Sequence, residues 1–319
     1  MKFRRILGTC LIGISLITLG ACNSDEASNE ESTTEANTTS TTSDTVSTTV
    51  VDTTTGVELS NGVNLAQSVT YEASSDALSY EKMLVAACEV GMNATICVEN
   101  YQTVVTSYTS GWGPGAQTTT KKEHTLLSFG SGVIYYKAET TTEGEYLYKV
   151  ITNEHVISAD DYNVVEGEEE YIIYDENYDE ELELELIGSD ADIDIAVLSF
   201  VSDRDYTAVT FESEENVKVG SSVIAVGTPI DFAYYNTCTY GIISKITSSF
   251  IQHNASINSG NSGGPLFNLS GSLVGINNAK LSGSTSSGTS IEGIYFAIPL
   301  SLVSKAIISI TGVNDIVYA

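Results

Sequence analysis

A succession of short segments with β-strand composition, each bounded by turn residues, most constrains the fold of this chain. Between residues 125 and 298, runs rich in Val, Ile, Leu and Tyr alternate with clusters of Gly, Asn, Asp and Ser. These runs include TLLSFGSGVIYY, YLYKVITNEHVI, ELELELIGSD, DIAVLSF and SSVIAVGTPI. Short strands at close spacing, with turn signals between them, are typical of antiparallel sandwiches and barrels. The sequence therefore predicts a large, mainly antiparallel β domain.

Two segments have helical rather than strand patterns. The stretch LSYEKMLVAACEVGMNATICVEN at 78–100 indicates a short helix that runs into a strand. Pro299 opens the segment PLSLVSKAIISI, whose apolar residues recur at helical spacing. These residues are Leu302, Val303, Ala306, Ile307 and Ile310. We therefore expect a short C-terminal helix at about 299–311, packed on the β domain through that face.

The first 22 residues have the pattern of a secretory signal. Basic residues precede an apolar run at 6–20, which is too short to cross a membrane as a helix. The run ends in LGAC, which resembles the lipobox of bacterial lipoproteins. That resemblance implies a lipid on Cys22 and an anchor to the outer face of the cytoplasmic membrane. An ordinary cleaved signal that happens to end in cysteine is the alternative.

A low-complexity stretch follows the signal. From Asn23 to about Val57 the residues are mostly Ser, Thr, Glu, Asp and Asn, with scarcely any large apolar side chain. Such a composition cannot repay the entropy lost on ordering. A transitional part then leads to about Ala77. We therefore predict a disordered linker over 23–77 and a folded domain over 78–319.

Net charge narrows the range of partners. The chain carries 13 Lys or Arg and 42 Asp or Glu, for a formal net charge of −29, and removal of the signal takes away only positive charge. A chain this acidic repels phosphate backbones and lacks the cations that bind them by counterion release. We therefore expect no nucleic-acid partner.

Acidic residues are concentrated at 160–185, which holds thirteen Asp or Glu and neither Lys nor Arg. The alternation in ELELEL suggests an edge hairpin with one acidic face in solvent. A solvated face without a ligand is the simpler interpretation. Calcium binding is the alternative, although these carboxylates are not spaced as a coordination loop.

Five cysteines are present, of which Cys10 and Cys22 fall in the signal segment. An exported chain permits disulfides, but Cys88, Cys97 and Cys238 are an odd number, and a core of this size needs no stapling. We favour three free or buried thiols, with a Cys88–Cys97 pair as the alternative. No spacing of Cys or His resembles a zinc site, so we expect neither a metal nor another cofactor.

One serine lies inside a glycine cluster, in the motif GNSGG. Ser262 offers a hydroxyl there, and the glycines permit backbone angles that let amide hydrogens converge on one point. Gly260 and Ser262 would donate those amides to an oxyanion. A structural turn is the alternative explanation of this cluster.

The other groups needed for hydrolysis by a serine are an imidazole and a carboxylate. VITNEHVI supplies His155 at the end of an apolar run. DADIDIAVL supplies Asp194 directly before a segment that reads as buried strand, whereas Asp190 and Asp192 read as solvated turn residues. Taken alone, His155 could equally be a packed or surface residue.

With their flanking segments, these residues resemble the trypsin-like serine proteases of the HtrA (Deg) family. The matching segments are GSGVI at 130–134, TNEHVI around His155, DIAVL from Asp194, VIAVGTPIDF from Val223, YGIIS from Tyr240, ASINSGNSGGPLFN around Ser262, and VGIN followed by YFAIPLSLV. The match covers about residues 78–311. The order His, Asp, Ser is also that of chymotrypsin-like enzymes.

The resemblance implies two six-stranded antiparallel β-barrels, the trypsin-like fold. The first barrel, at about 100–205, would hold His155 and Asp194, and the second, at about 206–298, would hold Ser262. His155 would take the proton of Ser262 during attack on a peptide carbonyl, while Asp194 holds the ring tautomer.

Specificity and assembly are also expectations from the resemblance. Ser256, six residues before Ser262, corresponds by position to the base of the primary specificity pocket. An uncharged residue there implies a preference for small or medium apolar side chains. The family forms trimers and usually carries PDZ domains, but we expect no PDZ domain beyond the C-terminal helix. His253 reads as a surface or core residue.

We therefore predict a membrane-tethered serine endopeptidase that cleaves unfolded or exported polypeptides through an acyl-enzyme intermediate. The alternative is a chaperone-like or binding lipoprotein with a latent site. In that alternative, loops around 232–239 hold the oxyanion amides out of register.

Overall fold

The computed structural model describes residues 50–67, 77–112, 116–160, 162–175, 181–279 and 292–319. The predicted signal peptide at 1–22, its lipidation site Cys22, and residues 23–49 and 68–76 of the predicted linker lie outside the described residues. Within the ranges described, no helix combines the length and the apolar composition needed to cross a membrane.

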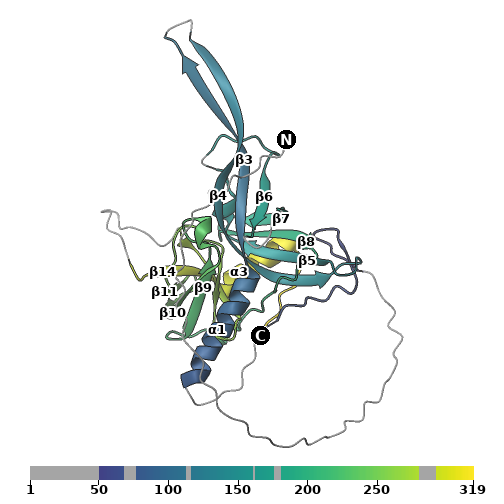
Figure 1. The fold of residues 1–319 in the computed structure, drawn as a ribbon, viewed down its shortest axis with the longest axis vertical. Coiled ribbons are helices and arrows are strands. Elements are labelled where there is room, and N and C mark those ends of the chain that lie inside the picture. Colours follow the sequence, from purple (N-terminus) through teal and green to yellow (C-terminus); the bar gives the residue numbers. More distant parts are fainter. Residues whose placement is uncertain (1–49, 68–76, 113–115, 161, 176–180, 280–291) are drawn as a thin grey trace, which may run out of the picture. The chain divides into compact units, whose positions relative to one another are not determined.

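The first barrel is closed by six antiparallel strands in the order β3-β4-β5-β8-β7-β6 (Figure 1). Its strands are β3 (Thr95–Ser110), β4 (Gln117–Glu139), β5 (Tyr146–Thr152), β6 (Glu170–Tyr174), β7 (Leu182–Asp190) and β8 (Ile195–Ser202). Side chains such as Val98, Val150 and Leu198 fill its interior and are fully buried. These are the β-branched and aliphatic residues that fit a pleated, half-buried surface.

The second barrel is also closed and antiparallel, in the order β10-β11-β14-β13-β12-β9. Its strands are β9 (Ser222–Gly227), β10 (Thr237–Ile246), β11 (Ile251–His253), β12 (Pro265–Phe267), β13 (Leu273–Asn277) and β14 (Tyr295–Pro299). The prediction of two six-stranded antiparallel barrels is confirmed. The first barrel begins at Thr95, slightly before the expected boundary at 100.

Within the described ranges, three α-helices accompany the barrels: α1 (Ala77–Ala94), α2 (Glu154–Ile157) and α3 (Leu300–Thr311). The 3₁₀ turn η2 (Glu214–Asn216) lies in the connection between the two barrels, and η3 (Phe232–Tyr234) lies between β9 and β10. Helix α3 buries Val303, Ala306 and Ile307, which belong to the face that the sequence predicts. It ends at Gly312, whose φ of 74° is the left-handed conformation that glycine adopts without strain.

The predicted disorder of 23–77 is wrong for residues 50–67. This segment forms the strand pair β1 (Val50–Val51) and β2 (Glu58–Leu59). Leu59 is only 1% exposed, and Leu65 N donates to Lys137 O of β4 at 2.7 Å. A composition poor in apolar residues did not reveal this order, because one buried leucine, backbone hydrogen bonds to the barrel and an ion pair with a buried lysine supply it.

A buried lysine ties this N-terminal segment to the rest of the fold. Lys149 on β5 is 1% exposed, and its Nζ lies 2.8 Å from Asp52 Oδ2 and 2.9 Å from Asp315 Oδ2. The same Nζ lies 4.6 Å from the ring centre of Tyr136. Burial alone would raise the pKa of Asp52, but hydrogen bonds from Lys149 and Thr54 outweigh it and lower the value to about 2. The network joins β1–β2, the first barrel and the C-terminal tail.

The acidic tract forms the hairpin that its alternation predicts, but not at a sheet edge. Strands β6 and β7 pair antiparallel, and Glu183 and Glu185 are exposed while Leu184 is buried. Because β6 also pairs with β3 and β7 with β8, barrel closure leaves neither strand an open edge. Among the described residues, no group of His, Cys, Asp or Glu is arranged to hold a metal ion.

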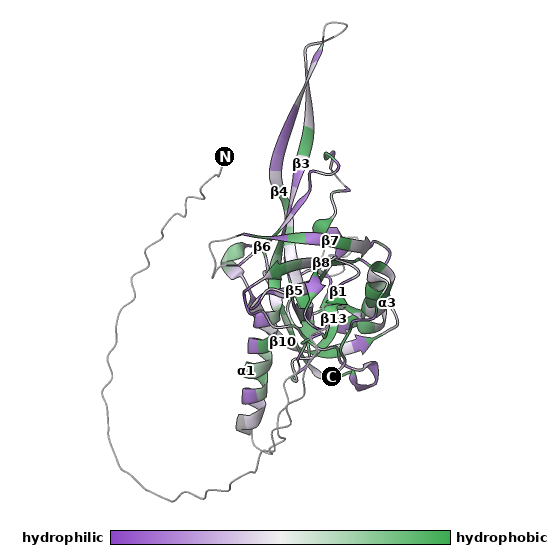
Figure 2. Cartoon of the chain, turned by 90° about the vertical axis from the view of Figure 1, so that its right-hand side faces the viewer, coloured by the Kyte–Doolittle hydropathy of each residue, from purple (hydrophilic) through white to green (hydrophobic). Residues whose placement is uncertain are grey.

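Hydropathy follows the barrels (Figure 2). Apolar residues are concentrated in the barrel strands, whereas the outer part of the β3–β4 hairpin is mostly hydrophilic. From the pair Thr106↔Lys121 to the pair Ser110↔Gln117, the residues on both strands are exposed. The outer part of the hairpin is therefore held by pairing between its two strands and has no hydrophobic core.

Candidate active site

A short helical turn positions His155. Strand β5 ends at Thr152, and Asn153 leads into α2, where His155 is the second residue. The backbone N–H of His155 donates to Asp194 Oδ1 at 3.0 Å, and its ring Nδ1 lies 2.8 Å from Asp194 Oδ2. Both side chains are 21% exposed. The Asp194 carboxylate therefore holds His155 through both the backbone N–H and the imidazole ring.

Asp194 is itself tightly constrained. It has a φ of 64°, a left-handed conformation that aspartate tolerates better than most residues. Asn153 Nδ2 donates to its carbonyl oxygen at 2.8 Å, and Asn278 Nδ2 donates to Oδ2 at 2.7 Å. A carboxylate facing Nδ1 favours the neutral tautomer with the proton on Nδ1. Nε2 then carries the free lone pair and can act as a base.

Asn278 was missed by the sequence reasoning. It lies directly after β13, and its amide joins the second barrel to Asp194 of the first. An asparagine after a strand is an ordinary turn residue. No local signal therefore distinguished it, and only the packing of the two barrels brings it to the carboxylate.

Ser262 lies on the loop between β11 and β12 and is 5% exposed. Its Oγ accepts a hydrogen bond from Ala279 N at 3.1 Å. Because Oγ is the acceptor in that bond, the hydroxyl proton stays available for donation to a base. Within the part of the chain described, Ser262 makes no hydrogen bond to the ring of His155.

Close packing nevertheless brings the Ser262 loop against the turn that carries His155. Gly263 has a φ of +82°, and a Cβ atom there would lie 2.2 Å from Thr152 Oγ1 and 2.8 Å from Asn153 N. No side chain fits in that space. The residue after Ser262 must therefore be glycine, because its backbone packs against the segment just before His155. This contact brings together Ser262 and His155, which are about a hundred residues apart in the chain.

Gly260 is the second glycine that the loop requires. Its φ is +97°, and a Cβ atom there would lie 2.1 Å from Thr228 O. Ser131 of β4 holds the loop, because its Oγ donates to Gly260 O at 2.7 Å and its N donates to Ser262 O at 2.8 Å. The amides of Gly260 and Ser262 meet no protein acceptor among the described residues. Both amides are therefore unpaired within the described residues, as the predicted oxyanion site requires.

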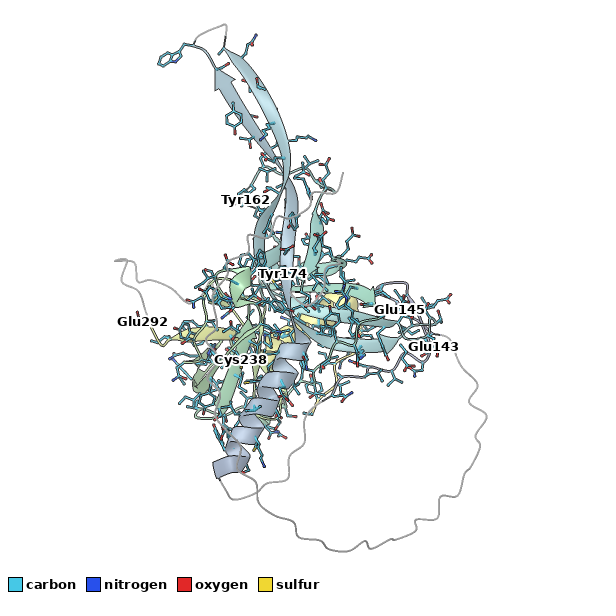
Figure 3. The ribbon with its side chains drawn as sticks, in the orientation of Figure 1. Glu143, Glu145, Tyr162, Tyr174, Cys238 and Glu292 are labelled. Carbon is cyan, nitrogen blue, oxygen red and sulfur yellow. The ribbon has the colours of Figure 1, made fainter. Side chains whose placement is uncertain are left out.

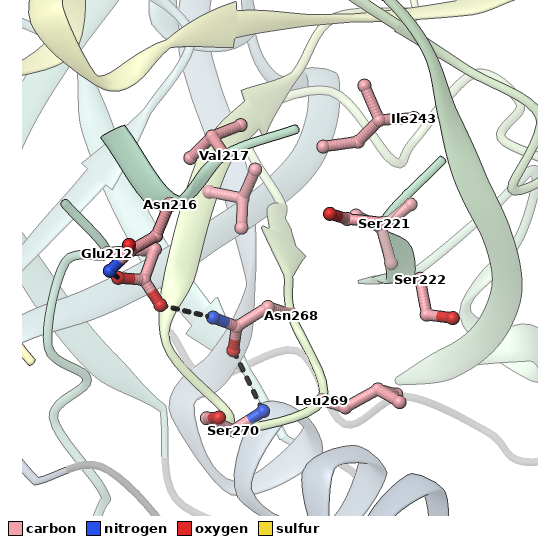
Figure 4. Close-up of a pocket in the computed structure, with 11 residues that line it drawn as sticks. Glu212, Asn216, Val217, Ser221, Ser222, Ile243, Asn268, Leu269 and Ser270 are labelled. Carbon is pink, nitrogen blue, oxygen red and sulfur yellow. Dashed lines mark hydrogen bonds between the residues drawn. The ribbon is translucent and has the colours of Figure 1, made fainter. Parts of the chain in front are cut away.

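Among the described residues, Ser256 makes no hydrogen bond to His155, Asp194 or Ser262. It is exposed, and its carbonyl oxygen accepts from Thr239 Oγ1 at 2.9 Å. A cavity of about 280 Å³ in the second barrel is lined by other residues, among them Glu212, Ser222 and Asn268 (Figure 4). There Asn268 Nδ2 donates to Glu212 Oε2 at 2.6 Å. That cavity contains none of His155, Asp194 and Ser262.

The part of the chain that carries His155, Asp194 and Ser262 is similar to known proteins. Residues 130–276 match the trypsin-like peptidase domain. This part of the chain is a trypsin-like peptidase domain. Curated relatives of the peptidase domain are serine proteases of the HtrA and DegP type, at 30–41% identity.

One relative of the peptidase domain is the serine protease Do-like HtrA of Lactobacillus helveticus, 36% identical over 66% of this chain and 48% of its own length. Another is the probable periplasmic serine endoprotease DegP-like of Rhizobium meliloti, 41% identical over 53% of this chain and 32% of its own length. The chain thus spans half or less of these two relatives. The crystal structure of the serine endoprotease from Yersinia pestis is similar with a TM-score of 0.50, at 27% identity, over 76% of this chain and 68% of the other.

His253 lies in the core of the peptidase domain, as one of the two interpretations expected. It is 0% exposed, and backbone groups of Ala255 and Phe296 lie beside its ring. Burial lowers the pKa of this imidazole from 6.5 to about 4, since the charged form would be desolvated.

The depressed pKa of His253 predicts a loss of stability in mild acid. The unfolded chain takes up a proton near pH 6.5 while the folded protein stays neutral to about pH 4, so stability is full above pH 6.5 and falls as the pH drops toward 4. The expected cost is about 2 to 3 kcal/mol by pH 4.5. Urea unfolding of His253→Leu should lack this component, whereas the half-exposed control His124→Leu should keep it. Equal pH slopes for His253→Leu and the wild type would refute the assignment.

Proposed function

We propose that this protein is a membrane-tethered serine endopeptidase in which Ser262, His155 and Asp194 act as nucleophile, general base and orienting carboxylate. The observation that carries the proposal is the His155–Asp194 pair, at 2.8 Å, beside a loop whose glycines accept no side chain. A structural histidine would not need a carboxylate that accepts from His155 N in the first barrel and from Asn278 Nδ2 of the second. The relatives of the peptidase domain support the same chemistry.

In this mechanism the proton moves along one line of groups. Nε2 of His155 takes the proton of Ser262 as Oγ attacks the scissile carbonyl carbon. Asp194 stabilises the imidazolium that forms and keeps Nδ1 protonated throughout. The imidazolium then protonates the leaving amine, and an acyl-enzyme remains on Ser262. Water activated by the same histidine hydrolyses the acyl-enzyme and restores the serine.

The amides of Gly260 and Ser262 stabilise the negative charge of the tetrahedral intermediates. Removing one donor of this kind typically slows catalysis by about 100- to 1000-fold. Ser131 of the first barrel supports the loop, because it donates to the carbonyl oxygens of Gly260 and Ser262. The two amides share their peptide planes with the carbonyl groups of Ser259 and Asn261, which accept from Ile230 N at 2.7 Å and from Gly264 N at 3.1 Å.

The proposed substrates are unfolded or exported polypeptides outside the cytoplasm. Some relatives are described as periplasmic, which supports export of this chain. The LGAC segment supports anchoring through a lipid on Cys22. The uncharged Ser256 supports a preference for small or medium apolar side chains, and a trimer is proposed from the resemblance alone.

A latent site is the second candidate function, and one observation favours it. Ser262 and His155 share no hydrogen bond in the described structure. In addition, the loop at 228–236, before β10, contacts Ser259, the residue next to Gly260. Ile230 N donates to Ser259 O at 2.7 Å, and Phe232 packs on Phe129 of β4 with ring centres 4.7 Å apart. Catalytic hydrogen bonds are, however, often formed only when substrate binds. A chaperone-like or binding role would follow if substrate did not complete the contact.

A fluorophosphonate probe and casein separate these two functions. The full-length protein, purified in mild detergent, should be labelled on Ser262 and should cleave casein, and Ser262→Ala should lose both. Ser259→Ala is the matched control, since this exposed serine lies in the same loop. Labelling that persists in Ser262→Ala would exclude Ser262 as nucleophile. A folded wild type that is neither labelled nor active would favour the latent lipoprotein.

A further inference from the structure

Two cysteines far apart in the chain meet where α1 packs on the second barrel. Cys88 of α1 and Cys238, the second residue of β10, are separated by 150 positions, yet their Sγ atoms lie 2.8 Å apart. Figure 3 labels Cys238, and Figure 1 shows α1 beside β10. The alternative pairing of Cys88 with Cys97 is not what the structure presents. Cys97 is fully buried on β3, and all three thiols are free.

The packing of α1 makes this contact a fixed one. A Cβ atom at Gly91 would lie 2.9 Å from the ring of Phe267, so helix and barrel are in close contact one turn away. Asn236 Nδ2 also donates to Met92 O at 2.6 Å. Cys88 and Cys238 both pack against the same hydrophobic cluster. The two sulfur atoms are therefore held together from both sides, by the helix and by the strand.

We propose that Cys88 and Cys238 form a reversible disulfide that fastens α1 to the second barrel. This inference does not rest on the proposed proteolytic function. Both residues are partly exposed, whereas Cys97 is fully buried. An exported protein meets the oxidising conditions in which disulfides persist.

The oxidant is a disulfide, either of a small thiol or of a dithiol oxidoreductase. One cysteine thiolate attacks that disulfide, forms a mixed disulfide and releases one thiol. The second cysteine then displaces the other thiol and closes the Cys88–Cys238 bond. Two protein thiols are oxidised, one external disulfide is reduced, and both protons end on the released thiols. Burial raises the pKa of the Cys238 thiol, so its thiolate is scarce and closure is slow near neutral pH.

The position of the bond connects it to both barrels. Helix α1 continues directly into β3 of the first barrel. Cys238 follows the loop at 228–236, which contacts Ser259, the residue before Gly260. Closure holds one end of that loop to the helix. It therefore restrains the segment next to Gly260 without touching the reacting groups.

Peptide mapping tests the bond directly. The full-length protein is incubated with glutathione disulfide or with dithiothreitol, alkylated, and digested with trypsin without reduction. Cleavage after lysine yields fragment 83–121, with Cys88 and Cys97, and fragment 219–245, with Cys238. The oxidised sample should contain these two fragments joined, and tandem fragmentation should assign the bond to Cys88. Oxidation should also raise the melting temperature by roughly 5 to 15 °C.

Matched variants guard against the wrong pairing. Cys97→Ala should keep the joined fragments and the rise in melting temperature, whereas Cys88→Ala and Cys238→Ala should lose both. The proposal is overturned if oxidised wild-type protein carries alkylated Cys88 and Cys238, or if fragment 83–121 is closed on itself through Cys97. Because the wild-type digest alone distinguishes these outcomes, the test does not depend on every variant folding.

Discussion

Replacing Asp194 by asparagine is expected to lower kcat for casein cleavage by about 10⁴-fold at neutral pH. The amide of asparagine would present N–H to Nδ1, so the ring would carry its proton on Nε2 and could no longer accept one from Ser262. The backbone should be undisturbed, because asparagine tolerates the left-handed φ of 64° at this position. Initial rates with fluorescently labelled casein, alongside circular dichroism to confirm folding, measure the effect.

Asp192→Asn is the matched control for that substitution. Asp192 is exposed, lies two residues away and has the same chemistry, so its replacement should leave kcat unchanged. If both variants lost activity equally, the loss would reflect the charge of the turn and not the orientation of His155. If Asp194→Asn lost less than tenfold, the orienting role would be wrong.

Replacing Lys149 by alanine is expected to destabilise the fold by about 3 to 5 kcal/mol. The substitution leaves the carboxylates of Asp52 and Asp315, whose side chains are only 9% and 13% exposed, without their cation. Urea unfolding at pH 7 measures the loss. The deficit should shrink as the pH falls below about 4, since uncompensated buried carboxylates take up protons readily while Asp52 of the wild type stays ionised to about pH 2.

Lys121→Ala provides the comparison for an exposed ion pair. Lys121 and Glu123 lie on β4 with side chains 60% and 62% exposed, and solvent screens such a pair so strongly that it contributes little to stability. Limited proteolysis adds a second measurement, because Lys149→Ala should release β1–β2 and expose residues 50–67 to cleavage. Equal stability losses in the two lysine variants would exclude a special role for the buried network.

The sequence by itself determined the strand-rich class, the two helices flanking the barrels and the candidates Ser262, His155 and Asp194. Alternating apolar residues, turn residues and the motif around Ser262 are local features, and local features survive in a linear sequence. The resemblance to a known family added the two-barrel arrangement, which the structure confirms.

Only the tertiary structure decided which distant groups meet. Asn278 reaches Asp194, Ser131 holds the oxyanion loop, Lys149 orders a segment that reads as linker, and Cys88 faces Cys238 instead of Cys97. Each contact joins residues tens to more than a hundred positions apart. Barrel closure and the packing of one barrel on the other create these contacts, and neither leaves a periodic or compositional trace at the residues involved.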